Sequence, residues 1–444
     1  MKSPIPDYLR EVLHTCAGVQ GGDVADYIEE LSLIPADLFA IAVCTVDGHL
    51  YHVGDVETPF TMQSISKPFT YALALQDQGL ERVLERVDVE PSGEAYNEIS
   101  LEQESGRPRN PMINAGALAT YGLVAGADAA DRQRRLLEFY STVAGRDLGL
   151  NEEVLNAELR TAFRNRAIAY LLRNAEIIEG DPGDVVDGYT AQCSVSVTVD
   201  DLARMAATLA NGGVHFTTGE QIVDPDAVRQ TLSVMLTCGM YDSAGDWVTS
   251  VGIPAKSGVS GGIIGVLPGQ VGIAVYSPPL DRHGNSVRGV RVFEQLSADM
   301  GLHIMSGPKT TFSVIAEAYL ADMRDGSGEQ VTVYEIQGDI KFAGAERIVR
   351  EFTDHVPDED RVLLDLSRAG GFDDVARRLV MEVIRRLMLH ERKTVYLVDP
   401  GAFLGDGPDV SGQDEGELRP RKLRRASDLI VEPLPDDDLA THAR

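Results

Sequence analysis

Two side chains in residues 63–68, Ser64 and Lys67, have the types and spacing needed for nucleophilic catalysis. Proline fits the first turn of a helix, so Pro68 predicts a helix that begins near Ser64. Three residues make almost one helical turn, which places the hydroxyl and the amine on one face. A lysine amine can take the serine proton once burial or a second cation lowers its pKa. The pair therefore predicts serine acylation chemistry.

A second lysine strengthens this prediction. Residues 3–308 contain only two lysines, Lys67 and Lys256, and the other positively charged residues in this range are arginines. Arginine keeps its proton in proteins and cannot act as a base. Lys256 begins a Lys-Ser-Gly element, which accompanies Ser-x-x-Lys in β-lactamases and penicillin-binding proteins. We expect both lysines to act in one site, and the alternative is two surface lysines with accidental neighbours.

Residues 258–262 also fit the Gly-x-Ser-x-Gly nucleophile elbow, with Ser260 as the nucleophile and Asp281 and His283 following in the right order. An elbow needs a strand, a sharp turn and a helix, whereas residues 263–266 are typical of a strand. We expect instead that these glycines let a ligand approach the backbone, whose N–H groups could stabilise an oxyanion. The Ser-His-Asp arrangement is the less favoured alternative.

The composition is that of a soluble globular protein of two or three domains, with 444 residues, 43% of them hydrophobic and 25% charged. A formal charge of −29 argues against nucleic acid or an anionic membrane as a partner. Four scattered cysteines and nine histidines without ligand spacing predict neither a disulfide framework nor a metal site, and we expect no cofactor. No secretory segment or membrane span is apparent, so we expect a cytoplasmic protein.

The surrounding pattern predicts an antiparallel sheet with a mostly helical insert. Apolar runs at residues 39–46 and 49–53 flank an Asp-Gly turn and indicate a hairpin. Residues 260–277 are typical of a second, glycine-rich hairpin. The residues between have helical periodicity, so strands from distant parts of the chain should share one sheet. Within the helical stretch, Glu158 and Asn165 lie seven residues apart and should share one helix face.

Shifts in composition divide the chain. Residues 1–310 form the first domain, and residues 311–328, which end in Asp-Gly-Ser-Gly, are expected to be a linker. Alternating strand and helix patterns predict a small α/β domain at residues 329–403. Residues 404–444 are rich in Gly, Asp, Pro and Arg, and we expect them to be disordered or loosely docked.

The first domain resembles the serine-dependent glutaminases from about residue 5 to residue 305. The segments that carry the resemblance are residues 63–68, 110–117, 209–213, 238–242, 254–259 and 277–281. The resemblance implies a β-lactamase/transpeptidase-like fold, with an antiparallel sheet and a helical subdomain. It also implies cofactor-free hydrolysis of the side-chain amide of L-glutamine to L-glutamate and ammonia.

The resemblance assigns roles to four residues at the reacting centre. It implies that Ser64 is the nucleophile and Lys67 its general base. Tyr241 matches the tyrosine that helps to relay protons beside the nucleophile. The backbone N–H groups of Ser64 and Val259 match the family's oxyanion hole.

Further residues are matched to substrate binding. The residues expected to hold the α-amino and α-carboxylate groups of glutamine are Asn114, Glu158, Asn165 and Tyr189. Tyr27 matches a tyrosine that closes over the substrate, and Gln63 is expected to touch the substrate. Residues 156–166 keep the Glu-to-Asn spacing but lack the family's usual flanking residues. Family membership also implies a homodimer or homotetramer.

The second domain resembles the STAS (anti-sigma factor antagonist) family. Residues 362–369 and the helix expected to start near residue 373 carry this resemblance. Regulatory members open that helix with Asp-Ser-Ser-Gly, whose serine is phosphorylated, whereas residues 373–376 here are Asp-Asp-Val-Ala. Our hypothesis is that serine phosphorylation does not switch this domain, which would instead bind a small ligand or a protein partner.

Two other functions remain open from the sequence. A penicillin-recognising serine enzyme would share Ser64 and Lys67, although the missing export signal and the additional glutaminase-like segments disfavour it. A catalytically silent glutamine sensor would have no need of an intact serine and lysine pair. Both remain alternatives to a cytoplasmic glutaminase with an appended regulatory or docking domain.

Overall fold

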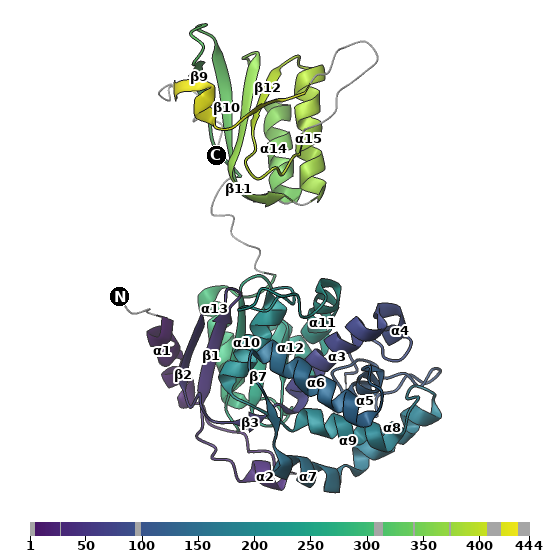
Figure 1. The fold of residues 1–444 in the computed structure, drawn as a ribbon. Helices are drawn as coiled ribbons and strands as arrows, with labels where there is room; N and C mark the ends of the chain where they lie inside the picture. The colour runs from purple at the N-terminus through teal and green to yellow at the C-terminus, as the bar shows by residue number, and fades with distance from the viewer. Residues whose placement is uncertain are drawn as a thin grey trace. The chain divides into compact units, whose positions relative to one another are not determined.

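The computed structural model describes residues 5–26, 28–93, 99–305, 314–340, 342–372, 374–405 and 419–433. The chain splits into two compact units, Met1–Gly307 and Pro308–Arg444 (Figure 1). Each unit has its own sheet and its own buried core, so each can be treated as a separate folded body.

A five-stranded antiparallel sheet forms the first unit's framework, in the order β2-β1-β8-β7-β6. Its strands are β1 (Ala40–Thr45), β2 (Leu50–Gly54), β6 (Ala255–Ser257), β7 (Gly262–Leu267) and β8 (Val271–Tyr276). Ala42 of β1 lies opposite Ala274 of β8, so two distant parts of the sequence meet in one sheet. This confirms the predicted antiparallel sheet.

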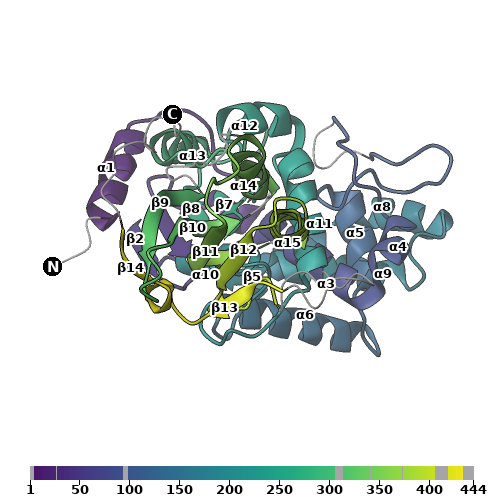
Figure 2. The same ribbon diagram turned by 90° about the horizontal axis from the view of Figure 1, so that it is seen from above.

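Both faces of this sheet are covered, which explains why β1, β7 and β8 are almost entirely apolar. The helices on one face are α1 (Ile5–Ala17), α12 (Ala244–Ser250) and α13 (Val287–Met300) (Figure 2). On the other face lies α10 (Val199–Ala210). A Cβ on Gly272 would lie 2.2 Å from the Ala207 backbone nitrogen, so glycine permits this close packing of α10 on β8.

The insert between the two parts of the sheet is mostly helical, as predicted. Its further helices are α3 (Ser66–Gln78), α4 (Leu80–Leu84), α5 (Asn114–Leu123), α6 (Ala129–Ala144), α7 (Glu152–Thr161), α8 (Phe163–Asn174), α9 (Pro182–Cys193) and α11 (Pro225–Cys238). Asp-Pro pairs begin two of them, because Asp181 and Asp224 cap the first N–H groups of α9 and α11. Among the described residues, no helix is long and apolar enough to cross a membrane.

Short elements complete the first unit. They are α2 (Glu29–Ser32) and the strands β3 (Phe60–Thr61), β4 (Gly149–Leu150) and β5 (Val195–Val197). The three strands form a small antiparallel sheet in the order β3-β5-β4, and its first strand leads directly into residues 63–68.

The second unit is a six-stranded mixed sheet in the order β13-β12-β11-β10-β9-β14. Its elements are β9 (Ile315–Met323), β10 (Gln330–Ile340), α14 (Phe342–Asp354), β11 (Arg361–Phe372), α15 (Asp374–Leu389), β12 (Thr394–Val398), β13 (Arg421–Leu423) and β14 (Ile430–Pro433). β10, β11, β12 and β13 run parallel, and α14 and α15 pack together on one face. This is an α/β unit of alternating strands and helices.

Two predictions about this part of the chain differ from the structure. β9 begins at Ile315, inside the predicted linker at residues 311–328, because it pairs along its length with β10. The predicted disordered tail at residues 404–444 contains β13 and β14, which pair with β12 and β9. Leu429 and Ile430 are buried against the sheet face opposite α14 and α15. Contacts with residues far away in sequence, rather than local propensity, hold this segment.

The buried tail segment predicts a local effect on stability. Leu429 is 8% exposed, so Leu429→Ala should lower the stability of the second unit by about 2–4 kcal/mol through the cavity it leaves. Hydrogen exchange along β9 and β10 of the full chain measures the loss. Ser427→Ala, at an exposed position of the same segment, is the control. Unchanged exchange in Leu429→Ala would contradict the docked position of the tail.

Candidate active site

Ser64 lies in a tight turn between the small sheet and α3. One 3-10 turn, η1 (Gln63–Ile65), follows β3, and α3 begins at Ser66. The helix therefore starts two residues later than predicted, with Pro68 in its first turn. Gln63 has a φ of 50°, a left-handed value that residues other than glycine rarely adopt. This strained turn holds Ser64 with only 6% of its surface exposed.

Both lysines of the predicted pair are buried. Lys67 is 1% exposed and Lys256 is fully buried. Lys67 Nζ donates to Asn114 Oδ1 at 2.7 Å and to the backbone oxygen of Met112 at 3.2 Å. Lys256 Nζ donates to the backbone oxygen of Ser257 at 2.8 Å. These acceptors are neutral, so they do not offset the cost of burying a charged ammonium group as a carboxylate would. The alternative of two surface lysines is wrong.

Burial lowers the pKa of both amines. The pKa of Lys67 falls to about 7, mainly because desolvation disfavours its charged form. The pKa of Lys256 lies well below its ordinary value, through desolvation and through repulsion from Lys67. A Lys67 amine with this pKa is substantially neutral at neutral pH, and a neutral amine can accept a proton.

Tyr241 lies near both lysines. The Lys256 Nζ is 3.7 Å from the centroid of its ring, and the Lys67 Nζ is 5.7 Å from it. Tyr241 opens a short 3-10 turn, η2 (Tyr241–Ser243), and its φ of 55° is again left-handed. An aromatic face attracts a cation, so this ring offsets part of the cost of burying the amines. The structure thus brings Lys67, Lys256 and Tyr241 together from α3, β6 and η2.

Polar side chains of the helical region form a hydrogen-bonded group that reaches Lys67 through Asn114. Asn114 begins α5, and its Oδ1 accepts both the Lys67 amine and the Tyr189 hydroxyl, the latter at 3.3 Å. Asn114 Nδ2 donates to Asn165 Oδ1 at 3.2 Å. Three of the residues predicted to hold the substrate therefore form one hydrogen-bonded group beside the amine.

Glu158 contacts the residue before Ser64. Gln63 Nε2 donates to Glu158 Oε1 at 2.7 Å, and burial raises the pKa of Glu158 to about 7. The prediction that Glu158 and Asn165 share one helix face is wrong, because α7 ends and α8 begins at a break at Ala162. Both side chains nevertheless point to the same site, one through Gln63 and the other through Asn114.

The turn after β6 approaches the turn that carries Ser64. A Cβ on Gly258 would lie 2.9 Å from the backbone oxygen of Met62, so glycine permits this contact between the two backbones. Val259 follows directly, which places its backbone near η1. Its side chain packs against Ile28 and other apolar residues of the N-terminal segment. Tyr27 lies outside the described residues.

The structure contradicts the nucleophile elbow at Ser260. The residues after it form strand β7 rather than a helix. Ser260 Oγ is buried and has no hydrogen-bond partner among the described residues. His283 Nδ1 instead pairs with Asp242 at 2.8 Å, and Asp281 accepts the backbone N–H of His283.

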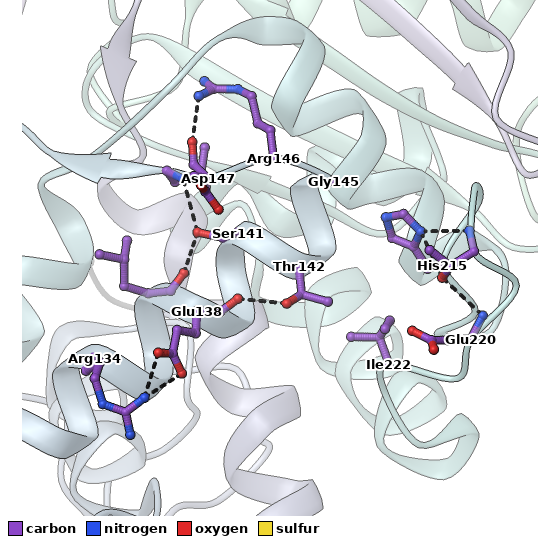
Figure 3. A pocket seen from close by; sticks show the side chains of 13 residues that line it. Arg134, Glu138, Ser141, Thr142, Gly145, Arg146, Asp147, His215, Glu220 and Ile222 are labelled. Carbon is purple, nitrogen blue, oxygen red and sulfur yellow. Dashed lines mark hydrogen bonds and ion pairs between the residues drawn. The ribbon is translucent and has the colours of Figure 1, made fainter.

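A surface pocket of about 670 Å³ lies between α6 and residues 215–222 (Figure 3). Its lining contains none of the predicted site residues, and Arg134 there is paired with Glu138. Within the described ranges, no group of His, Cys, Asp and Glu side chains is arranged to hold a metal ion.

Sequence reasoning missed four polar side chains that are buried beneath η1. They are Ser66, Thr70, Tyr140 and Gln192. The available signal was a polar residue among apolar neighbours in each helix, which does not indicate a partner. These residues hydrogen bond across three helices, so their association depends on the tertiary fold.

Comparison with known proteins identifies the family of the chain. Residues 22–305, more than half of the chain, match the family model described as Glutaminase. The chain belongs to the glutaminase family. It is therefore an amidohydrolase that acts on glutamine.

Named relatives support the same assignment. A glutaminase of Corynebacterium efficiens is 48% identical over 405 residues, which cover 91% of this chain and 94% of that protein. A glutaminase of Trichormus variabilis is 51% identical over 302 residues, which cover 68% of this chain and 90% of its own length. The alignment with the Corynebacterium efficiens protein, over 405 residues, is longer than the first unit, Met1–Gly307. The similarity of this glutaminase to that protein therefore extends into the second unit.

Solved structures agree with the fold. The crystal structure of Mglu has a TM-score of 0.80 and 44% identity, and the match covers 90% of this chain and 99% of Mglu. A probable glutaminase, ybaS, has a TM-score of 0.67 and 39% identity, over 69% of this chain and all of its own. These neighbours are consistent with the β-lactamase-like fold expected for the first unit.

The lowered pKa of Lys67 predicts how activity depends on pH. A protonated amine cannot take a proton, so kcat should rise with pH through about 7 and reach a plateau above it. Glu158 ionises above about 7, and this should lower KM over the same range if its carboxylate holds the α-ammonium group, as the sequence predicts. Initial rates across pH separate the two effects. A kcat that rises only near the ordinary lysine pKa would contradict a neutral Lys67.

Proposed function

We propose that this glutaminase hydrolyses the side-chain amide of L-glutamine through an acyl-enzyme on Ser64. The observation that carries the proposal is the buried Lys67 amine, one helical turn after Ser64, whose pKa is lowered to about 7. A base with this pKa suits catalysis at neutral pH, because it is free to accept a proton and strong enough to take one.

In the first step, Lys67 accepts the proton of Ser64 Oγ as this oxygen attacks the carboxamide carbon. A carbon–oxygen bond forms, and the carbonyl oxygen becomes an oxyanion. The backbone N–H groups of Ser64 and Val259 are proposed to stabilise this charge. A well-placed donor of this kind typically contributes about 3–4 kcal/mol.

In the second step, the tetrahedral intermediate collapses. The carbon–nitrogen bond breaks, and the amine leaves as ammonia after receiving the proton that Lys67 holds. Tyr241, near both lysines, is suited to relay this proton. Water then attacks the glutamyl ester, gives a proton back to the base, and releases L-glutamate with Ser64 restored. The cycle needs no cofactor.

Substrate recognition uses the polar residues around the lysines. The Glu158 carboxylate is suited to the α-ammonium group of glutamine, and Gln63, which now donates to Glu158, would share that site. The neutral donors proposed to hold the α-carboxylate are Asn114, Asn165 and Tyr189. Tyr27 is proposed to close over the bound substrate.

The alternatives from the sequence are now less favoured. The family match and the relatives' names favour glutamine over penicillin as substrate. A silent sensor would not need a buried amine without a carboxylate partner one turn from a serine, since burying such a group lowers stability without serving binding. Labelling by a fluorescent penicillin would restore the first alternative, and glutamine binding without turnover would restore the second.

We further propose that the second unit is a STAS-like regulatory or docking domain. Its parallel strands β10, β11 and β12, with α14 and α15 on one face, are compatible with that family. Its ligand or partner, the homodimer or homotetramer, and the cytoplasmic location stay predictions. Light scattering of the purified chain measures the oligomeric state.

The catalytic proposal predicts the effect of two substitutions. Ser64→Ala should lower kcat by about a thousandfold or more, and Lys67→Met should do the same, because nucleophile and base act as a unit. The measurement is ammonia release from L-glutamine. Ser233→Ala, at an exposed helix position, is the control and should keep full activity. Substantial turnover by Ser64→Ala would contradict the acyl-enzyme.

The second unit gives a separate prediction. Phosphopeptide mapping of the protein from growing cells should find no stoichiometric phosphate in residues 365–376, because the Asp-Ser-Ser-Gly element is replaced. Part of this segment, residue 373, lies outside the described residues. A phosphate present on most molecules would refute the hypothesis that ligand or partner binding, rather than phosphorylation, controls this unit.

A further inference from the structure

Four buried polar side chains form a continuous chain of hydrogen bonds under the turn that carries Ser64. Tyr140 comes from α6, Thr70 and Ser66 from α3, and Gln192 from α9. Their exposed fractions are between 0% and 2%. Groups this deeply buried lose hydrogen bonds to water, so their mutual bonds are needed to offset that loss.

Gln192 is bonded at both ends of its side-chain amide. Gln192 Nε2 donates to Ser66 Oγ at 3.1 Å, and Thr70 Oγ1 donates to Gln192 Oε1 at 2.9 Å. The Thr70 and Tyr140 hydroxyls lie 2.6 Å apart and either can be the donor, because each also lies 3.2 Å from the Ser66 backbone oxygen as a second acceptor. Burial raises the pKa of Tyr140, which keeps its hydroxyl protonated.

The chain ends on the backbone of the strained residue. Ser66 Oγ donates to the backbone oxygen of Gln63 at 2.7 Å, and the Ser66 N–H donates to the same oxygen. Gln63 has the left-handed φ of 50°, a conformation that persists only when its surroundings enforce it. The hydroxyl of Ser66 and the residues behind it therefore help to hold this conformation.

Fixing the Gln63 carbonyl also fixes the next N–H group. A trans peptide is planar, and its C=O and N–H point in opposite directions; the structure contains no cis peptide among the described residues. Because the Gln63 oxygen points into the buried chain, the Ser64 N–H points away from it. In the proposed mechanism, this N–H group donates a hydrogen bond to the oxyanion.

We propose that the chain from Tyr140 through Thr70, Gln192 and Ser66 positions the Ser64 N–H as an oxyanion donor, with Gln192 as its central positioning residue. The proposal rests on the acyl-enzyme function proposed above. Gln192 suits this role because its amide both donates and accepts, and so bonds two residues of α3, Ser66 and Thr70, at once. Its helix, α9, also carries Tyr189, so the same element supports the substrate pocket and the nucleophile turn.

Measuring kcat and KM separately for variants of the chain tests the proposal. Gln192→Met keeps much of the volume but removes both bonds, and Ser66→Ala removes the last donor with a smaller change. Each should lower kcat by about 10- to 100-fold, less than the loss of a whole oxyanion donor, while KM changes by no more than about twofold. Calorimetry with L-glutamate should give a dissociation constant within about twofold of the wild-type value, since the residues proposed to hold the α-amino and α-carboxylate groups are unchanged.

The control is Thr190→Val, also on α9. Thr190 is 2% exposed, and its hydroxyl donates to the backbone of its own helix rather than to the chain. It should keep the wild-type kcat. Thr70→Ser, which retains the hydroxyl, should also remain close to wild type, whereas Thr70→Val should lose kcat as Gln192→Met does.

Wild-type kcat in folded Gln192→Met and Ser66→Ala would overturn the proposal, as would an equal loss in Thr190→Val or a parallel loss of glutamate binding. If Gln192→Met does not fold, Ser66→Ala alone decides. Ser64→Ala, assayed alongside, distinguishes a failure of the proposed acyl-enzyme function from a failure of the positioning role. If it remains active, the acyl-enzyme itself fails; if it is inactive while the chain variants are fully active, only the positioning role fails.

Discussion

The burial of two lysine amines beside neutral partners is the constraint on which this site depends. Transfer of an ammonium group out of water is costly unless a carboxylate compensates, and here the amines meet amide and backbone oxygens and one aromatic ring. The lower-energy state has at least one neutral amine. A neutral amine can accept a proton, so the same burial that weakens the fold suits Lys67 to the proposed role of base for Ser64.

This constraint explains why the site lies between the sheet and the helical region. Lys256 stands on β6, at the sheet's edge, while Ser64 and Lys67 belong to the turn and helix that follow β3. Neither part alone could bury both amines. The core that includes Met62, Ile65 and Phe69 also contains residues of β1, β7 and β8, so it joins the two parts into one rigid body. Gly258 allows their backbones to touch.

Much of this arrangement could be predicted from the sequence, because it depends on the spacing of residues within short motifs and strands. The two lysines and the two apolar hairpins predicted the meeting of Lys67 with Lys256 and the antiparallel sheet, and Ser-x-x-Lys led to the proposed reacting pair. The break at Ala162 was not predicted, since it interrupts a continuous helical pattern without glycine or proline. The docked segment at residues 419–433 and the bonds of Gln192 were also missed. Both depend on partners far away in sequence, which periodicity does not reveal.

Direct detection of the covalent intermediate tests the central claim most sharply. The full chain is mixed with L-glutamine, quenched in acid during turnover, digested and analysed by mass spectrometry. The account predicts a glutamyl ester on the peptide that contains Ser64, formed at the rate of ammonia release and absent without substrate. Turnover with no adduct at Ser64, or an adduct on another residue such as Ser260, would contradict it.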